Sequence, residues 1–240
     1  MIDLVVPSNA IISGSTRSGK TYLLKKLLKD QILKKIDYLI ILSPTANLTS
    51  DWDEPEFREN DKEEKGLVVQ KFHKVADFQT IIEEIVEQQT AIIEHNEDKA
   101  KKDQYLPQVF IVIDDSIYQK ILSYKGIVDK LSIRSRHLNI SLWVLVQKLK
   151  GIPRSFRVNS RYCFVFNSSN YSELEAFTEE FCAKEMRKNL RRQLQDIFNE
   201  SYNYILCDCF STKLCDRLYL NGKELLYDRL KDKPKTEEKE

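Results

Sequence analysis

Residues 14–21 read GSTRSGKT, a full match to the GxxxxGK[ST] phosphate-binding loop, and no other feature constrains the fold as much. The motif requires a strand before it and a helix after it. Residues 10–12 are apolar, and beyond the loop apolar residues recur at helical spacing from Leu23 to Ile36. The segment therefore predicts a nucleotide-binding loop between a buried strand and a helix.

The residue types of the motif fit Mg²⁺-ATP. Gly14 and Gly19 allow a tight turn whose backbone N–H groups point at a phosphate at the positive end of the helix. Lys20 can reach the β- and γ-phosphates, and the Thr21 hydroxyl can hold Mg²⁺. The alternative is a glycine-rich turn with an incidental lysine. The residues expected at the nucleotide are Gly14, Ser15, Thr16, Arg17, Ser18, Gly19, Lys20, Thr21 and Tyr22.

Length and charge limit the remaining possibilities. The chain has 240 residues, of which 42% are hydrophobic, enough for one sizeable α/β domain. We expect a single P-loop ATPase domain over residues 1–230 and a disordered charged tail over 231–240. The net charge of +1 gives no general attraction to nucleic acid, so any DNA contact must be local.

The sequence predicts an intracellular protein without a membrane anchor. The N-terminus lacks a signal pattern, and no apolar run reaches the roughly 20 residues that a membrane span needs. Five cysteines without a CxxC pair favour reduced thiols over a disulfide framework or a structural zinc site. Three scattered histidines suggest no further metal site, so Mg²⁺ is the only metal expected.

Further apolar runs alternate with helical patterns, which predicts a mainly parallel sheet with helices on both faces. The charged stretch 49–66 lacks periodicity and is expected to be a mobile loop. The expected strands are 37–42, 67–72, 109–113, 140–147, 161–166, 204–209 and 217–220, and the expected helices are 75–94, 121–136 and one or two within 171–200.

Two acids follow the most apolar of these strands. Asp114 and Asp115 come directly after residues 109–113, at the carboxyl end where ligands collect in open α/β sheets. They complete a Walker B pattern. We assign Asp114 to Mg²⁺ and Asp115 to the attacking water, which it would orient or deprotonate. The alternative is a pair of acids that merely closes a strand.

Gln147 ends the next apolar strand. In the additional-strand class of P-loop ATPases this strand is inserted between the two motif strands. A polar residue at its tip would then lie beside the γ-phosphate, and we therefore expect Gln147 to sense it. The alternative is an ordinary strand end.

Four segments together resemble a known family. GSTRSGKT, the IVIDD strand end, SRHLNISLWVLVQ beginning at Ser135 and RVNSRYCFVF beginning at Arg157 are similar to the poxvirus-type DNA-packaging ATPases of large DNA viruses and virophages. That family belongs to the FtsK/HerA superfamily of ring-forming DNA pumps. The resemblance covers roughly residues 11–166 and implies the additional-strand, RecA/FtsK-like P-loop fold.

The resemblance also implies a function. The chain would hydrolyse ATP to move double-stranded DNA into a preformed capsid, as a homo-oligomeric ring that contacts a capsid or portal component. Arg136, or else Arg134, would reach the nucleotide of the neighbouring subunit. The expected location is the host cytoplasm or viral factory, or the virion. The wider superfamily commonly has Asp-Glu where this chain has Asp114-Asp115, and the viral branch resembles this chain there.

Two basic clusters are candidate DNA contacts, and the alternative for each is a solvated face, which is the commoner role of such clusters. The first lies just after Gln147 and carries four cations without an acid: Lys148, Lys150, Arg154 and Arg157. The second comprises Arg187, Lys188, Arg191 and Arg192, which helical spacing would gather on one side.

Two other function classes remain open. A small P-loop nucleoside or nucleotide kinase would carry an arginine-bearing lid, for which the 187–192 cluster could be mistaken. Gln147 on a strand after the aspartates argues against a kinase. A binding protein with a silent nucleotide site is disfavoured by the complete set of Lys20, Thr21 and Asp114.

Overall fold

The apolar runs form the strands of one sheet in the computed structural model, which describes residues 2–46, 48–60, 66–114, 121–168, 170–182, 184–211, 213 and 217–226. The sheet order is β3-β2-β4-β5-β1-β6-β7-β8-β9. The strands are β1 (Asn9–Ser13), β2 (Tyr38–Leu42), β3 (Val68–Phe72), β4 (Val109–Ile113), β5 (Ile140–Val146), β6 (Tyr162–Phe166), β7 (Tyr204–Asp208), β8 (Leu218–Leu220) and β9 (Glu224–Leu225).

The order of the central strands confirms the additional-strand class. β5 pairs in parallel with β1 on one side, where Ile12 lies opposite Leu145, and with β4 on the other, where Ile113 lies opposite Val144. The strand that ends before Gln147 therefore separates the two motif strands. From β3 to β6 the sheet is parallel, whereas β7, β8 and β9 pair antiparallel at one edge, so the predicted mainly parallel sheet is confirmed.

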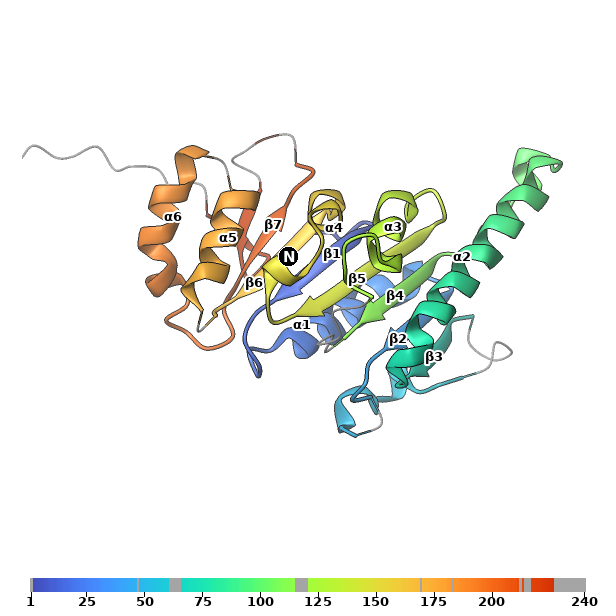
Figure 1. Ribbon diagram of the computed structural model, residues 1–240, viewed down its shortest axis with the longest axis horizontal. Coiled ribbons are helices and arrows are strands. Elements are labelled where there is room, and N and C mark those ends of the chain that lie inside the picture. Colours follow the sequence, from blue (N-terminus) through green and yellow to red (C-terminus); the bar gives the residue numbers. More distant parts are fainter. Residues whose placement is uncertain are drawn as a thin grey trace, which may run out of the picture.

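Helices cover both faces of the sheet, which explains why every residue of β1, β4 and β5 is buried. α1 packs on one face through Leu23, Leu24 and Leu27. The other helices pack on the opposite face, with α5 and α6 beside the β6–β7 end (Figure 1). The helices are α1 (Lys20–Leu27), α2 (Val75–Glu97), α3 (Ile127–Arg134), α4 (Arg154–Asn159), α5 (Tyr171–Phe181) and α6 (Lys184–Ile197).

Two helices differ from the sequence prediction. The helix predicted over 121–136 begins only after Gly126, as α3. The short helix α4 was not predicted, although Pro153 directly before it is a favourable start because its missing N–H would have no partner there anyway. Within 171–200, where one or two helices were predicted, the structure has two, α5 and α6.

Of the stretch 49–66 in the β2–β3 connection, where the sequence predicts a mobile loop, the structure describes residues 49–60 and 66, and residues 49–60 are packed against the core. Trp52 is 1% exposed and Phe57 is fully buried, with their rings edge to face at 5.4 Å between centroids. Both rings join the face of the sheet that α1 covers. Periodicity could not reveal this packing, because two anchoring aromatic residues in a charged loop form no repeating pattern.

The structure bears on the predictions made for the cysteines, while those for the C-terminal tail and the domain boundaries stay predictions. The described cysteines, Cys163, Cys182, Cys207 and Cys209, are free, and burial raises the pKa of Cys182 to about 12. A neutral, buried thiol such as that of Cys182 is unreactive, and the sequence analysis expected reduced thiols. The tail over 231–240 lies outside the described residues, and the boundaries of the domain stay a prediction.

Replacing Phe57 tests whether this loop is part of the core. Phe57→Ala should lower the free energy of unfolding by about 3–5 kcal/mol, because it removes a buried ring and leaves a cavity. Leu48→Ala, in the same connection but 81% exposed, should change it by less than about 0.5 kcal/mol. Urea unfolding followed by tryptophan fluorescence measures both. Equal effects of the two substitutions would contradict the packed loop.

Candidate nucleotide site

The loop between β1 and α1 has the backbone shape that its glycines allow. Gly19 precedes α1 with a φ of 100°, a left-handed conformation that side chains disfavour. At Gly14, a Cβ atom would lie 2.7 Å from the Cβ of Phe166 and 2.8 Å from Ser18 Oγ. Both positions therefore require glycine, one for its backbone angle and one for space.

Lys20 is the first residue of α1 and folds back over this loop. Its Nζ donates hydrogen bonds to the carbonyl oxygens of Gly14 at 2.9 Å and Ser15 at 2.8 Å. A triphosphate in the loop would offer this ammonium charged acceptors, which make stronger bonds than carbonyl groups. The position of the positive charge is thus set by the loop that would receive the phosphates.

The phosphate-binding motif and the acid after β4 come together at one edge of the sheet. Thr21 Oγ1 donates to the buried Asp114 carboxylate, at 3.2 Å from Oδ2 and 3.4 Å from Oδ1. Asp114 follows β4, which is separated from β1 by β5 alone, and parallel strands end at the same edge. A hydroxyl and a carboxylate are hard oxygen donors that fit Mg²⁺, which binds through few protein groups plus phosphates and water. Asp115 lies outside the described residues.

A cavity of about 620 Å³ opens at this edge, within the range of small-molecule sites. Gln147 lies on it directly after β5, as the sequence analysis expected. Gly14, Ser15 and Ser18 belong to the loop but do not line the cavity. The lining residues are Thr16, Arg17, Gly19, Lys20, Thr21, Tyr22, Thr45, Asp51, Asp114, Leu122, Leu145, Val146, Gln147, Lys148 and Gly151.

Sequence reasoning missed Thr45 and Asp51, which reach the cavity from the connection after β2. β2 pairs in parallel with β4, so its carboxyl end lies next to that of the Walker B strand. A usable signal existed in the strand predicted over 37–42. Applying to that strand the edge rule that singled out Asp114 would have pointed to Thr45, just beyond the strand, but not to Asp51.

Arg134 and Arg136 lie at the opposite end of β5 from Gln147. Both side chains are exposed, neither lines the cavity, and the Arg136 guanidinium lies 5.3 Å from the ring centroid of Phe210. This is within cation–π distance. Their contact with a neighbouring subunit stays a prediction.

The first basic cluster divides into exposed and engaged cations. Lys148 lines the cavity, and Lys150 and Arg154 are exposed around the turn that leads to α4. Arg157 binds the Glu180 carboxylate of α5 through Nε at 2.6 Å and Nη2 at 3.0 Å. This bidentate pair joins α4 to α5, so Arg157 is the weakest DNA candidate of the four.

The second cluster also holds helices together. Arg191 of α6 donates to Thr178 Oγ1 at 3.1 Å and to Glu179 Oε1 at 3.0 Å, both on α5. Arg187 donates to the carbonyl oxygen of Cys182 at 3.1 Å. Two of the four cations therefore serve packing between helices. In the described part of the chain, none of the helices combines the length and apolar character needed to cross a membrane.

Comparison with solved structures finds the same fold in other proteins, a DNA-packaging ATPase among them. The DNA-packaging ATPase B204 from Sulfolobus Turreted Icosahedral Virus aligns with a TM-score of 0.60 and 15% identity, over 89% of this chain and 96% of that one. B204 from Sulfolobus turreted icosahedral virus 2, in complex with ATP-gammaS, aligns with a TM-score of 0.56 and 17% identity, over 89% of this chain and 95% of that one.

The pCW3 conjugation coupling protein TcpA, with ATPgS, gives a TM-score of 0.62 and 15% identity over 95% of this chain and 65% of that one. At these identities the likeness concerns the fold. No curated protein matches the sequence. A protein-family model does match the sequence, over residues 4–215, a range that includes the phosphate-binding loop, Asp114 and Gln147. The chain belongs to the Poxvirus A32 protein family.

Proposed function

We propose that this protein is a viral packaging motor that hydrolyses ATP to move double-stranded DNA into a preformed capsid. The observation that carries the ATPase is the Thr21–Asp114 contact, made across β5 inside a cavity that also holds Lys20 and Gln147. The family membership and the fold shared with packaging ATPases support the DNA-moving role.

The residues divide the work of binding and hydrolysis. Backbone N–H groups of the loop and Lys20 hold the phosphates, and Lys20 offsets the charge of the triphosphate. Thr21 and Asp114 would hold Mg²⁺, which supplies charge neutralisation when bound. Gln147 contacts the γ-phosphate from the tip of β5, and Asp115 orients or deprotonates the attacking water.

The arginines lie at the edge of the sheet opposite the nucleotide cavity, which leaves them free to contact a neighbouring subunit. Arg136, with Arg134 as second choice, acts in trans on the next nucleotide in a homo-oligomeric ring. Lys148, Lys150 and Arg154 grip DNA phosphates without reading bases. A capsid or portal component is the further partner, and the host cytoplasm or viral factory the place of action.

The structure disfavours the kinase alternative. A kinase lid would place arginines over the cavity, whereas Arg187 and Arg191 bind groups within and beside α5. β5 between the two motif strands, with Gln147 at its tip, is the arrangement of the additional-strand ATPases.

The reaction itself separates the two functions. Phosphate release should rise several-fold when double-stranded DNA is added, because a motor couples turnover to its track. Adding nucleosides as acceptors should give no phosphorylated product. DNA-independent release together with a phosphorylated nucleoside would contradict the motor.

Substitutions at the cavity should separate binding from turnover. Lys20→Ala should lower turnover by about 100-fold or more and weaken nucleotide binding, because it removes the ammonium group that offsets the negative charge of the phosphates. Asp115→Asn should still bind ATP but lose about 100-fold or more in turnover. Single-turnover assays alongside analogue binding measure both effects. Undiminished turnover of Asp115→Asn would overturn its assignment as base.

Mixing subunits tests Arg136. Arg136→Ala subunits titrated into wild-type protein should lower ATPase activity by more than their own fraction, because each would impair a neighbour's site. Lys130→Ala, on the exposed side of α3, serves as the control and should leave activity unchanged. A strictly proportional loss with Arg136→Ala would exclude an action in trans.

A further inference from the structure

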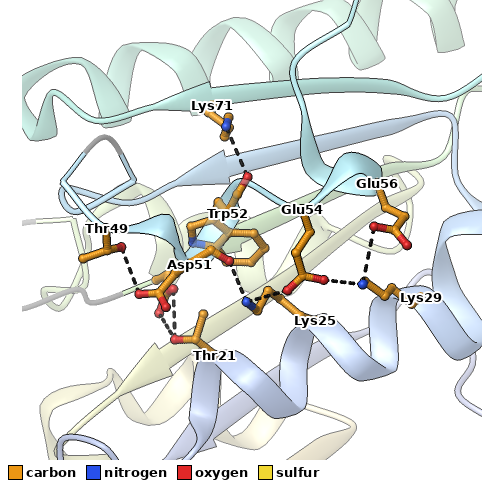
Figure 2. A network of polar contacts seen from close by, with 10 residues as sticks. Thr21, Lys25, Lys29, Thr49, Asp51, Trp52, Glu54, Glu56 and Lys71 are labelled. Carbon is orange, nitrogen blue, oxygen red and sulfur yellow. Dashed lines mark hydrogen bonds and ion pairs between the residues drawn. The ribbon is translucent and has the colours of Figure 1, made fainter.

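Asp51 brings a second carboxylate to the nucleotide cavity. It lies in the short turn Ser50–Trp52, far in sequence from both motifs, yet lines the same cavity as Thr21 and Asp114. Figure 2 shows it above Thr21, among polar side chains from the β2–β3 connection, α1 and β3. An acid placed beside an anion site needs an explanation, because it would repel a bare triphosphate.

The backbone of Asp51 is fixed to the helix that begins at the phosphate loop. Lys25 Nζ donates to the carbonyl oxygen of Asp51 at 2.7 Å and pairs with Glu54 at 2.8 Å (Figure 2). Lys25 lies four residues after Thr21, so both side chains project from the same face of α1. The link gives Asp51 a defined position relative to Thr21.

Three further contacts hold the same segment. Trp52, the next residue, is buried, and its carbonyl oxygen accepts a hydrogen bond from Lys71 Nζ of β3 at 3.3 Å. Lys29, in the helical turn Leu28–Ile32 that follows α1, bridges Glu54 and Glu56. The segment that carries Asp51 is therefore held in place by contacts to α1 on one side and to β3 on the other.

The side chain of Asp51 is oriented as well. Thr49 Oγ1 donates to its Oδ2 at 2.9 Å (Figure 2). With Asp114 on the same cavity, two carboxylates surround a space whose phosphate side carries Lys20. Such a pair is stable beside a triphosphate when a divalent cation lies among the groups, and Mg²⁺ retains several waters that donate hydrogen bonds to acids.

We propose that Asp51 accepts hydrogen bonds from water on the nucleotide's Mg²⁺ and so makes the cavity select the magnesium complex over bare triphosphate. This inference rests on the proposed ATPase site. It assigns Asp51 a specificity role that neither motif contains. The same charge favours the complex, which carries the cation, and disfavours the metal-free nucleotide, so the effect has opposite signs in the two conditions.

The ratio of two dissociation constants tests the inference. Calorimetry with a non-hydrolysable ATP analogue gives the dissociation constant in Mg²⁺ and in EDTA for the full chain. Asp51→Asn should reduce the preference for Mg²⁺ by about tenfold, the size of one charge-assisted hydrogen bond. It should bind more weakly in Mg²⁺, with equal or tighter binding in EDTA.

Two variants control for charge and folding. Asp53→Asn makes the same change two residues away, on an exposed side chain that does not line the cavity, and should keep the wild-type ratio. Thr49→Val removes the hydrogen bond that orients Asp51 and should reduce the preference for binding in Mg²⁺ over binding in EDTA by a smaller factor than Asp51→Asn does. An unchanged ratio for Asp51→Asn, or equal weakening in Mg²⁺ and EDTA, would overturn the inference.

A separate measurement keeps the two proposals apart. DNA-stimulated phosphate release by wild-type protein tests the motor and does not depend on Asp51. Its absence, with an altered ratio for Asp51→Asn, would contradict the motor and support the role of Asp51. Normal stimulation with an unaltered ratio would contradict the role of Asp51 alone.

Discussion

The contact between Thr21 and Asp114 is the constraint on which the site depends. It joins the first turn of α1 to the end of β4, through two residues that are 93 positions apart in sequence. The parallel arrangement of β4, β5 and β1 brings both groups to the carboxyl edge of the sheet, beside the cavity. The buried apolar strands thus stabilise the fold and also set the spacing of the chemical groups.

The two edges of the sheet serve different purposes. The carboxyl edge gathers Lys20, Asp114, Gln147 and Asp51 around the cavity. The opposite edge presents Arg134 and Arg136 on an exposed surface. The action proposed for Arg136 on a neighbour's nucleotide fits this separation, because such a residue must lie away from its own nucleotide.

Positive charge in this chain has three distinct uses that a sequence pattern does not separate. Arg157 and Arg191 tie helices to one another through Glu180 and Glu179, whereas Lys148, Lys150 and Arg154 remain exposed near the cavity or beside it. Lys25 has a third use, since it holds the segment of Asp51 against α1. Which cations remain available for a ligand depends on which acids the fold places within reach.

The sequence by itself determined the local chemistry: the phosphate loop, the apolar strands, the acid after β4 and the glutamine after β5. These follow from short-range order and periodicity, which a single chain displays directly. The tertiary structure alone decided the antiparallel edge, the burial of Trp52 and Phe57, the pairing of Arg157 and the entry of Asp51 into the cavity. Those outcomes depend on which strands become neighbours, because pairing between distant segments has no local signature in the sequence.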